Sequence, residues 1–248
     1  MKTYQERMEM ALEAVLEMLP RTLERENDPA RNAEGGMTSM LIGDLRDIAV
    51  TAYTLRKDKA EFLTKLSESA AKKLILFERH EKGEPIDNSY VAMLSYEHLF
   101  DALAAGNFDL ARRLATHMGG RDAIEKEHDH PFDYALGYTL KSFVLNDRPA
   151  MEKWTAVFES ECMKSENKDF QGYPMVFKGV LDKDASKVKE GFDLIIKGHK
   201  KQSKGSGVFM FTPDEMLCVW GVGLANLVRS FGVDFEIDDP LIPAELFS

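Results

Sequence analysis

The chain has 248 residues, a hydrophobic fraction of 44% and a formal net charge of −10 at pH 7. This apolar content suits a folded protein with a sizeable core and argues against a disordered chain. The acidic balance makes nucleic acid a poor partner, because binding to phosphates needs an excess of basic side chains. Proline and glycine do not cluster into a linker, so we expect one continuous domain over residues 1–248.

The N-terminal segment, residues 1–19, carries charged residues every few positions, which argues against a secretory signal. No window of the sequence approaches the ~20 apolar residues that span a bilayer. We therefore expect a cytoplasmic protein that has no membrane partner. Cys162 and Cys218 lack the spacing of a zinc or redox motif, and we expect both to be packed thiols.

Apolar residues recur with a period near 3.6 along nearly the whole sequence, and this period predicts helices. The first three apolar stripes are Leu12, Val15, Leu16 and Leu19; Met40, Leu41, Leu45, Ile48, Ala49 and Ala52; and Phe62, Leu66, Ala70 and Leu74. Further helices are predicted over residues 90–105, 110–118, 132–145, 151–163, 170–181, 188–199 and 214–230. The expected fold class is therefore all-α.

Four breaks between the predicted helices share one pattern, a polar residue that can cap a helix followed four positions later by an apolar one. The caps are Asp58, Asn107, Asp147 and Asp184, and the apolar residues are Phe62, Ala111, Met151 and Val188. Subtracting the residue numbers gives intervals of 49, 40 and 37 residues between successive caps. We therefore expect irregular, repeat-like stacked helical hairpins, which would form a concave surface for binding.

The C-terminal segment after the last predicted helix is acidic. Residues 233–248 carry five carboxylates and no lysine or arginine. Val233, Phe235 and Ile237 alternate with polar residues, which predicts a short extended tail anchored by the apolar residues 216–231. An acidic surface on a rigid helical body is suited to docking a basic partner.

A set of stretches in the C-terminal part of the chain also resembles a known family. The stretches are FDYALGYTLKSFVLND, YPMVFKGVLDKDASKVKEGFDLIIKGHKK, MLCVWGVGLANLVRSFGV and FEIDDPLIPAELF. In this order, over roughly residues 90–248, they resemble immunity-protein family 49, which is found beside polymorphic toxins of bacteria. The resemblance implies an antidote that binds and neutralises a cognate toxin, with no catalysis and no cofactor. The first 80 residues match only as generic helix.

We expect the partner, the cognate toxin, to be held by acidic side chains and aromatic anchors. Many toxins encoded beside such genes act on nucleic acids, so the resemblance implies that carboxylates could occupy their basic substrate-binding groups. Aromatic residues near helix starts and turns are typical interface anchors. The predicted partner-binding residues are Asp147, Asp182, Asp184, Asp234, Glu236, Asp238, Asp239, Phe132, Tyr134 and Tyr173.

Two other functions remain open from the sequence. The first is a helical-repeat scaffold or regulator that binds a protein and has no toxin partner. The second is a metal-dependent enzyme, since Glu127, His128, Asp129 and His130 are all metal-ligating residue types and Asp133 follows closely. His128 and His130 lack the helical spacing of two histidines four positions apart, so we favour a polar loop there.

Overall fold

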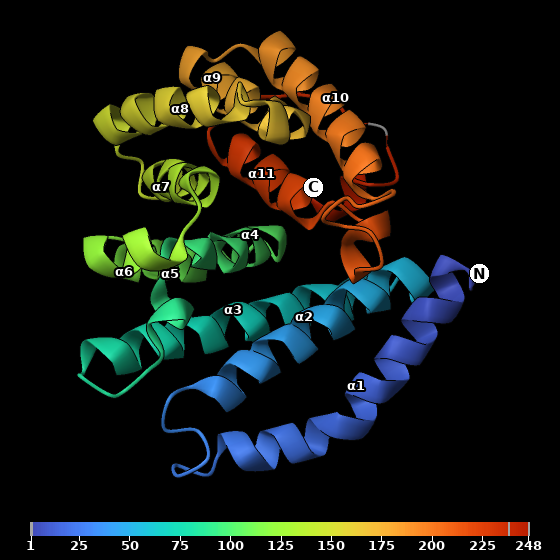
Figure 1. The fold of residues 1–248 in the computed structure, drawn as a ribbon. Helices are drawn as coiled ribbons and strands as arrows, with labels where there is room; N and C mark the ends of the chain where they lie inside the picture. The colour runs from blue at the N-terminus through green and yellow to red at the C-terminus, as the bar shows by residue number, and fades with distance from the viewer. Residues whose placement is uncertain (1, 238, 248) are drawn as a thin grey trace.

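In a computed structural model, which describes residues 2–237 and 239–247, the chain is built of α-helices joined by short turns (Figure 1). No strand occurs among these residues, so the all-α prediction is confirmed. The α-helices are α1 (Tyr4–Glu26), α2 (Gly36–Arg56), α3 (Lys59–Glu81), α4 (Tyr96–Ala104), α5 (Phe108–His117), α6 (Asp122–His128), α7 (Pro131–Val144), α8 (Arg148–Cys162), α9 (Gly172–Asp182), α10 (Ala185–Gln202) and α11 (Val219–Ser230). Short 3-10 helices lie between some of them: η1 (Asn88–Val91), η2 (Met93–Ser95), η3 (Ser165–Phe170), η4 (Pro213–Met216) and η5 (Ala244–Leu246).

Four hairpins, α2–α3, α4–α5, α7–α8 and α9–α10, form around the four predicted caps. Each cap side chain accepts a hydrogen bond from the amide three residues later, as expected for an N-cap; the caps are Asp58, Asn107, Asp147 and Asp184. The residue before each cap has a left-handed backbone conformation, with φ of 56° at Lys57, 69° at Gly106, 54° at Asn146 and 54° at Lys183. The four apolar residues that follow the caps are buried. One turn geometry therefore reverses the chain four times.

The inner side of the hairpin stack is filled by the chain itself. Figure 1 shows α11 enclosed by the hairpins, with α4 on one side and α8 to α10 on the other. Contact with α4 is close, because a Cβ at Gly223 would lie 2.6 Å from the carbonyl oxygen of Phe100. Asn226 of α11 donates to the carbonyl of Leu103 at 2.8 Å. The open concave binding surface expected from the sequence is therefore absent over the part of the stack that α11 covers.

The fit of α11 against α4 yields a stability prediction. Gly223→Ala should lower the free energy of unfolding by about 1–3 kcal/mol, because the added methyl group meets backbone that cannot yield. Gly43→Ala in α2 is the control, since a Cβ there meets nothing within 4 Å and the helix gains up to about 1 kcal/mol from alanine. Urea denaturation of both variants measures the difference. Equal effects at the two positions would contradict the packing described here.

The stripe of α1 departs from the prediction. Leu12, Val15 and Leu19 are only half-buried, and Leu16 is exposed. Met8 and Thr22 are the buried residues of α1, and helix packing on it comes mainly from α2, so one edge of its apolar stripe has no second layer to cover it. Met40 in α2, which belongs to the second predicted stripe, is also exposed. The third predicted stripe, on α3, is fully buried.

The C-terminal tail is extended and anchored, as the alternation predicts. Val233 and Phe235 are buried, whereas Asp234 and Glu236 between and beyond them are exposed. Phe235 stacks between Phe192 of α10 and Phe247, with ring centroids 4.9 Å and 6.0 Å away. Among the described residues, no helix combines the length and apolarity needed to cross a bilayer.

Candidate functional site

A pocket of about 370 Å³ lies where segments from the whole length of the chain converge. Its aromatic residues are Tyr96, Phe132, Phe170, Phe209 and Trp220, and its charged residues are Arg46, Glu97, Asp133 and Asp214. They come from α2, α4, α7, η3, α11, η4 and the segment between α10 and η4. The volume falls in the range of pockets that bind small ligands or single side chains.

Arg46 ties three separate elements together at the base of this pocket. Its two terminal nitrogens bind the carboxylate of Asp214 in η4 at 2.6 and 2.9 Å, and its Nε binds Asp101 of α4 at 3.1 Å. Burial disfavours the charge on Arg46, but Asp214 and Asp101 outweigh it and hold the pKa of Arg46 well above its ordinary value. Asp101 is completely buried and also contacts His98 at 3.1 Å. All three nitrogens of the guanidinium are thus engaged.

Removing this arginine should be severely destabilising. Arg46→Met leaves the buried carboxylates of Asp101 and Asp214 without their cation, and we expect a loss of about 3–5 kcal/mol in the free energy of unfolding. Arg31→Met is the matched control, because the Arg31–Asp28 pair is exposed and such pairs contribute less than about 1 kcal/mol. Denaturant unfolding of the two variants tests this. Similar losses would show that Arg46 is not a structural cross-link.

Glu97 is the charged pocket residue that lacks a partner. Its carboxylate makes no hydrogen bond with any described residue, and its side chain is half-buried. Burial raises the pKa of Glu97 to about 7, with the negative charges of Asp101, Asp214 and Asp133 adding to the effect and Arg46 opposing it. Lys73 on α3 is the other nearby cation, and burial lowers its pKa to about 8 despite the attraction of Glu97. Above the pKa of Glu97, the three carboxylates that line the pocket, Glu97, Asp133 and Asp214, outnumber Arg46, its lining cation.

The shift at Glu97 predicts a pH dependence of stability. The unfolded chain releases this proton near its ordinary pKa of 4.5, whereas the folded chain keeps it until about pH 7. Between these values the folded state binds more protons, so stability falls as pH rises. Glu97→Gln removes that contribution, and its free energy of unfolding should decline less from pH 5 to pH 7 than that of the parent.

Urea denaturation at pH 5, 6 and 7 measures this difference. A smaller decline in the free energy of unfolding remains in both proteins and comes from Asp47, because burial raises the pKa of Asp47 to about 6. As pH rises, the Asp47 contribution levels off near pH 6, whereas that of Glu97 continues to about pH 7. The interval from pH 6 to pH 7 is therefore the most informative. Parallel profiles for the parent and Glu97→Gln across that interval would contradict the assignment to Glu97.

The aromatic side chains form a continuous wall along the pocket. The ring centroids of Phe132 and Phe170 are 5.0 Å apart, and those of Phe170 and Trp220 are 6.4 Å apart. Phe209 continues the wall at 5.9 Å from Trp220 with an interplanar angle of 88°, so the two rings form a corner. Tyr96 stands edge-on to Trp220 and donates from its hydroxyl to Asp133 at 3.0 Å.

Two of the three aromatic residues predicted as partner anchors are buried in the free chain. Phe132 lines the pocket wall, but its ring is buried against Phe158 and Phe170. Tyr173 of α9 is also buried, and its ring packs edge-on against Trp220. Tyr134 is half-buried in a separate aromatic cluster with Tyr138 and Trp154. Of the three, Phe132 belongs to the pocket.

The segment from Ser203 to Leu217, which we call the rim segment, closes one side of the pocket. Val208, Phe209 and Thr212 line the pocket from it. Tyr4 donates to the carbonyl of Pro213 at 2.9 Å, and Arg7 pairs with Glu215 at 2.6 Å, so the start of α1 fixes this segment. Figure 1 shows the rim segment passing between α10 and the N-terminal end of α1.

The rim segment points apolar side chains outward. Val208, Phe211 and Met216 are 63%, 56% and 52% exposed. Phe211 has a φ of 66°, a left-handed conformation that is costly for a bulky residue. Its amide donates to Glu215 at 3.1 Å and Arg7 lies 5.0 Å over its ring, which together hold it in place.

The predicted acidic residues fall into two groups, one at the turns that precede α8 and α10 and one in the C-terminal tail. Asp147 and Asp184 cap α8 and α10, and Asp182 pairs with Lys187. Arg148 donates to the carbonyl of Leu181, so these turns are neighbours. In the tail, Asp239 pairs with Lys200, sixteen residues or about 24 Å along the helix axis beyond Asp184. Asp234 and Glu236 flank Phe235, which stacks on Phe192 near the middle of α10.

Within the tail, the carboxylates differ in how far they are available. Asp234 and Glu236 are exposed. Asp239 is not free for a partner, because it holds Lys200 at 2.6 Å and accepts from the amide of Leu241 at 3.0 Å. Asp238 lies outside the described residues. The single acidic surface expected from the sequence is thus divided, and Asp239 mainly fixes the tail.

The residues considered for metal binding, Glu127 to His130 and Asp133, do not form one site, because several of them make separate structural hydrogen bonds. Asp129 accepts from the amides of Met93 and Leu94, both at 2.8 Å. His130 caps α7 by accepting from Phe132, and Asp133 points into the pocket toward Tyr96. Among the described residues, no three His, Cys, Asp or Glu side chains converge in a geometry that could hold a metal ion.

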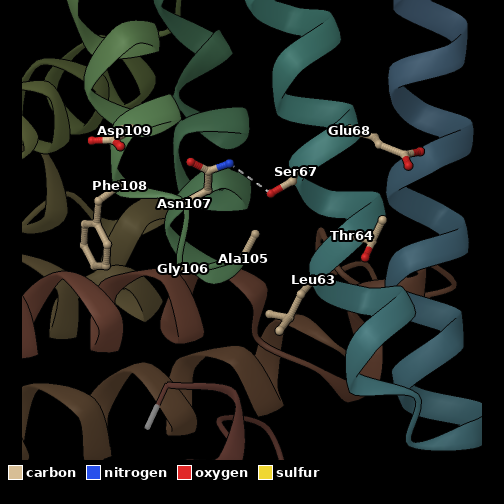
Figure 2. Close-up of a pocket in the computed structure, with 9 residues that line it drawn as sticks. All are labelled: Leu63, Thr64, Ser67, Glu68, Ala105, Gly106, Asn107, Phe108 and Asp109. Carbon is tan, nitrogen blue, oxygen red and sulfur yellow. Dashed lines mark hydrogen bonds between the residues drawn. The ribbon is translucent and has the colours of Figure 1, made fainter.

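A second hollow of about 680 Å³ lies between α3 and the α4–α5 turn (Figure 2). Its polar residue Asn107 is already used, since it caps α5 and donates to Ser67 at 3.3 Å. Figure 2 shows Glu68 and Asp109 on opposite sides of the hollow and not converging on a common point. The hollow follows from the turn geometry and offers no comparable set of chemical groups.

The sequence analysis did not single out Arg46, Glu97 or Phe209. Arg46 and Glu97 each lie within an apolar helical stripe, and a charge in such a stripe is the one local signal that could have marked them. No family model, curated protein or solved structure matches the chain.

Proposed function

We propose that this chain is an immunity protein that binds a cognate bacterial toxin and neutralises it by covering the toxin's active site. Two independent features support the proposal. The first is the resemblance of the C-terminal stretches to immunity-protein family 49. The second is the rim segment, which presents apolar side chains on a fixed backbone.

Phe211 is the observation that carries the binding part of the proposal. Its side chain is exposed, its backbone has a left-handed φ of 66°, and contacts with Arg7 and Glu215 hold it in place. Strained residues concentrate at binding sites, and exposed aromatic residues are common anchors of protein interfaces. A fixed loop also loses little conformational freedom on binding, which favours affinity. Val208 and Met216 are further exposed apolar residues of the same segment.

The acidic residues then act on the rate of encounter. Asp234 and Glu236 are exposed and can attract a basic toxin surface, whereas apolar contacts of the rim segment set the rate of dissociation. Neutralisation in this mechanism follows mass action. It requires one immunity protein for each toxin molecule and leaves the toxin chemically unchanged.

Co-expression with the product of the adjacent gene tests this function. We expect protection of the cells and copurification of the two proteins at a fixed ratio. Phe211→Ser should weaken the complex by about 2 kcal/mol or more, because it removes a central anchor. Leu145→Ser is the matched control, since Leu145 is an exposed apolar residue just beyond the far end of α7, roughly 20 Å from the pocket.

The outcomes separate the alternatives. Protection at strongly substoichiometric amounts, with the toxin covalently modified, would show an enzyme instead of an inhibitor. A stable complex with a different protein and no protection would favour the helical-repeat scaffold. Equal effects of Phe211→Ser and Leu145→Ser on binding would remove the rim segment from the interface.

A further inference from the structure

We infer that the pocket beneath the rim segment binds an organic cation, a guanidinium or ammonium group. In the setting of the proposed function, this cation is a basic side chain of the partner that inserts between the aromatic wall and Glu97. The chemistry of the pocket supports the inference independently of any partner. The supporting features are the carboxylate of Glu97, which has no hydrogen-bond partner among the described residues, the aromatic rings and the opening of the pocket to solvent.

The charges favour a cation over an anion. Arg46 is the basic residue lining the pocket, and its three nitrogens are already bound to Asp101 and Asp214. The guanidinium of Arg46 is therefore not available to bind a phosphate or carboxylate ligand with two nitrogens. Glu97 faces the same space without a hydrogen-bond partner among the described residues, and Asp133 holds only the hydroxyl of Tyr96. A bound cation would offset this excess of negative charge.

The aromatic wall supplies the second element of cation recognition. A cation over the face of an aromatic ring is attracted by the ring quadrupole, and tryptophan is the strongest partner. Trp220 and Phe209 meet at nearly a right angle and form a corner, and Phe170 adds a third ring beside Trp220. Guanidinium is planar and weakly hydrated, so it stacks on such faces more readily than a compact ammonium group.

The position of the pocket allows a side chain to enter from outside. Val208 lines the pocket and is also largely exposed, so the pocket opens beside the rim segment. The same segment carries Phe211, the proposed apolar anchor. A basic side chain could therefore enter while apolar contacts form around it. The volume of about 370 Å³ exceeds that of one guanidinium group and leaves room for its aliphatic stem.

The probe is methylguanidinium chloride, titrated against this chain alone. Trp154→Phe leaves Trp220 as the remaining tryptophan, so its fluorescence reports on the pocket. The titration is performed at pH 8, above the pKa of Glu97 and at constant ionic strength. We expect a saturable change in Trp220 emission. Methylurea has nearly the same shape without the charge, and we expect no saturable change with it.

Glu97→Gln in the same background tests the carboxylate. We expect its dissociation constant for methylguanidinium to rise by at least about tenfold, as the loss of one charge-assisted hydrogen bond implies. Glu190→Gln is the control, because Glu190 is an exposed carboxylate on α10 away from the pocket. Asp133→Asn serves as a second variant, and circular dichroism verifies that each variant is folded.

Several outcomes would overturn the inference. They are a linear response to methylguanidinium, an equal response to methylurea, and unchanged binding in folded Glu97→Gln and Asp133→Asn. Because no toxin is present, this experiment is separate from the test of neutralisation. Saturable binding without any toxin complex would retain the cation site as a small-molecule site and reject the proposed function. A toxin complex unaffected by Glu97→Gln would place the partner's basic side chains elsewhere.

Discussion

The buried guanidinium of Arg46 is the constraint on which the arrangement of this molecule depends. It joins α2 to α4 through Asp101 and to η4 through Asp214, residues separated by up to 168 positions in the sequence. Burying three charged groups is costly, and only near-complete pairing makes it tolerable. The pairing of Arg46 with Asp101 and Asp214 offsets the desolvation penalty, and through Asp214 it also fixes the rim segment over the pocket. Stability and the shape of the candidate site are therefore set by the same contacts.

The filling of the stack by α11 decides where a partner can bind. Stacked helical hairpins usually leave a concave face for ligands. Here Gly223 lets α11 approach the backbone of α4, and apolar residues surround almost the whole helix. The rim segment and α1 each carry several exposed apolar residues, and others are scattered over the remaining helices. The rim segment is held by Tyr4 and Arg7 of α1 and by His199 of α10.

The pocket and the rim segment make complementary contributions to recognition. Apolar surface such as Phe211 provides affinity with little selectivity, whereas a charge-lined pocket rejects groups of the wrong sign. Glu97 is strained electrostatically in the free chain, since burial and neighbouring carboxylates raise its pKa to about 7. A cation placed beside it relieves that strain. Binding sites commonly hold such groups because the free energy stored in the free state is released on association.

The sequence by itself determined most of the helices and the four capped turns, but it did not predict α6, which contains Glu127 and His128 of the expected polar loop. The period of the apolar residues and the caps Asp58, Asn107, Asp147 and Asp184 are local signals, each decided within a few residues. The alternation of Val233 and Phe235 likewise predicted the extended tail. Tertiary structure alone decided which apolar faces are covered. Leu16, on a predicted apolar stripe, is exposed, whereas Tyr173, predicted to contact a partner, is buried. It also assembled the pocket, because Arg46, Glu97 and Trp220 lie on helices whose packing depends on long-range contacts, and local periodicity carries no information about those contacts.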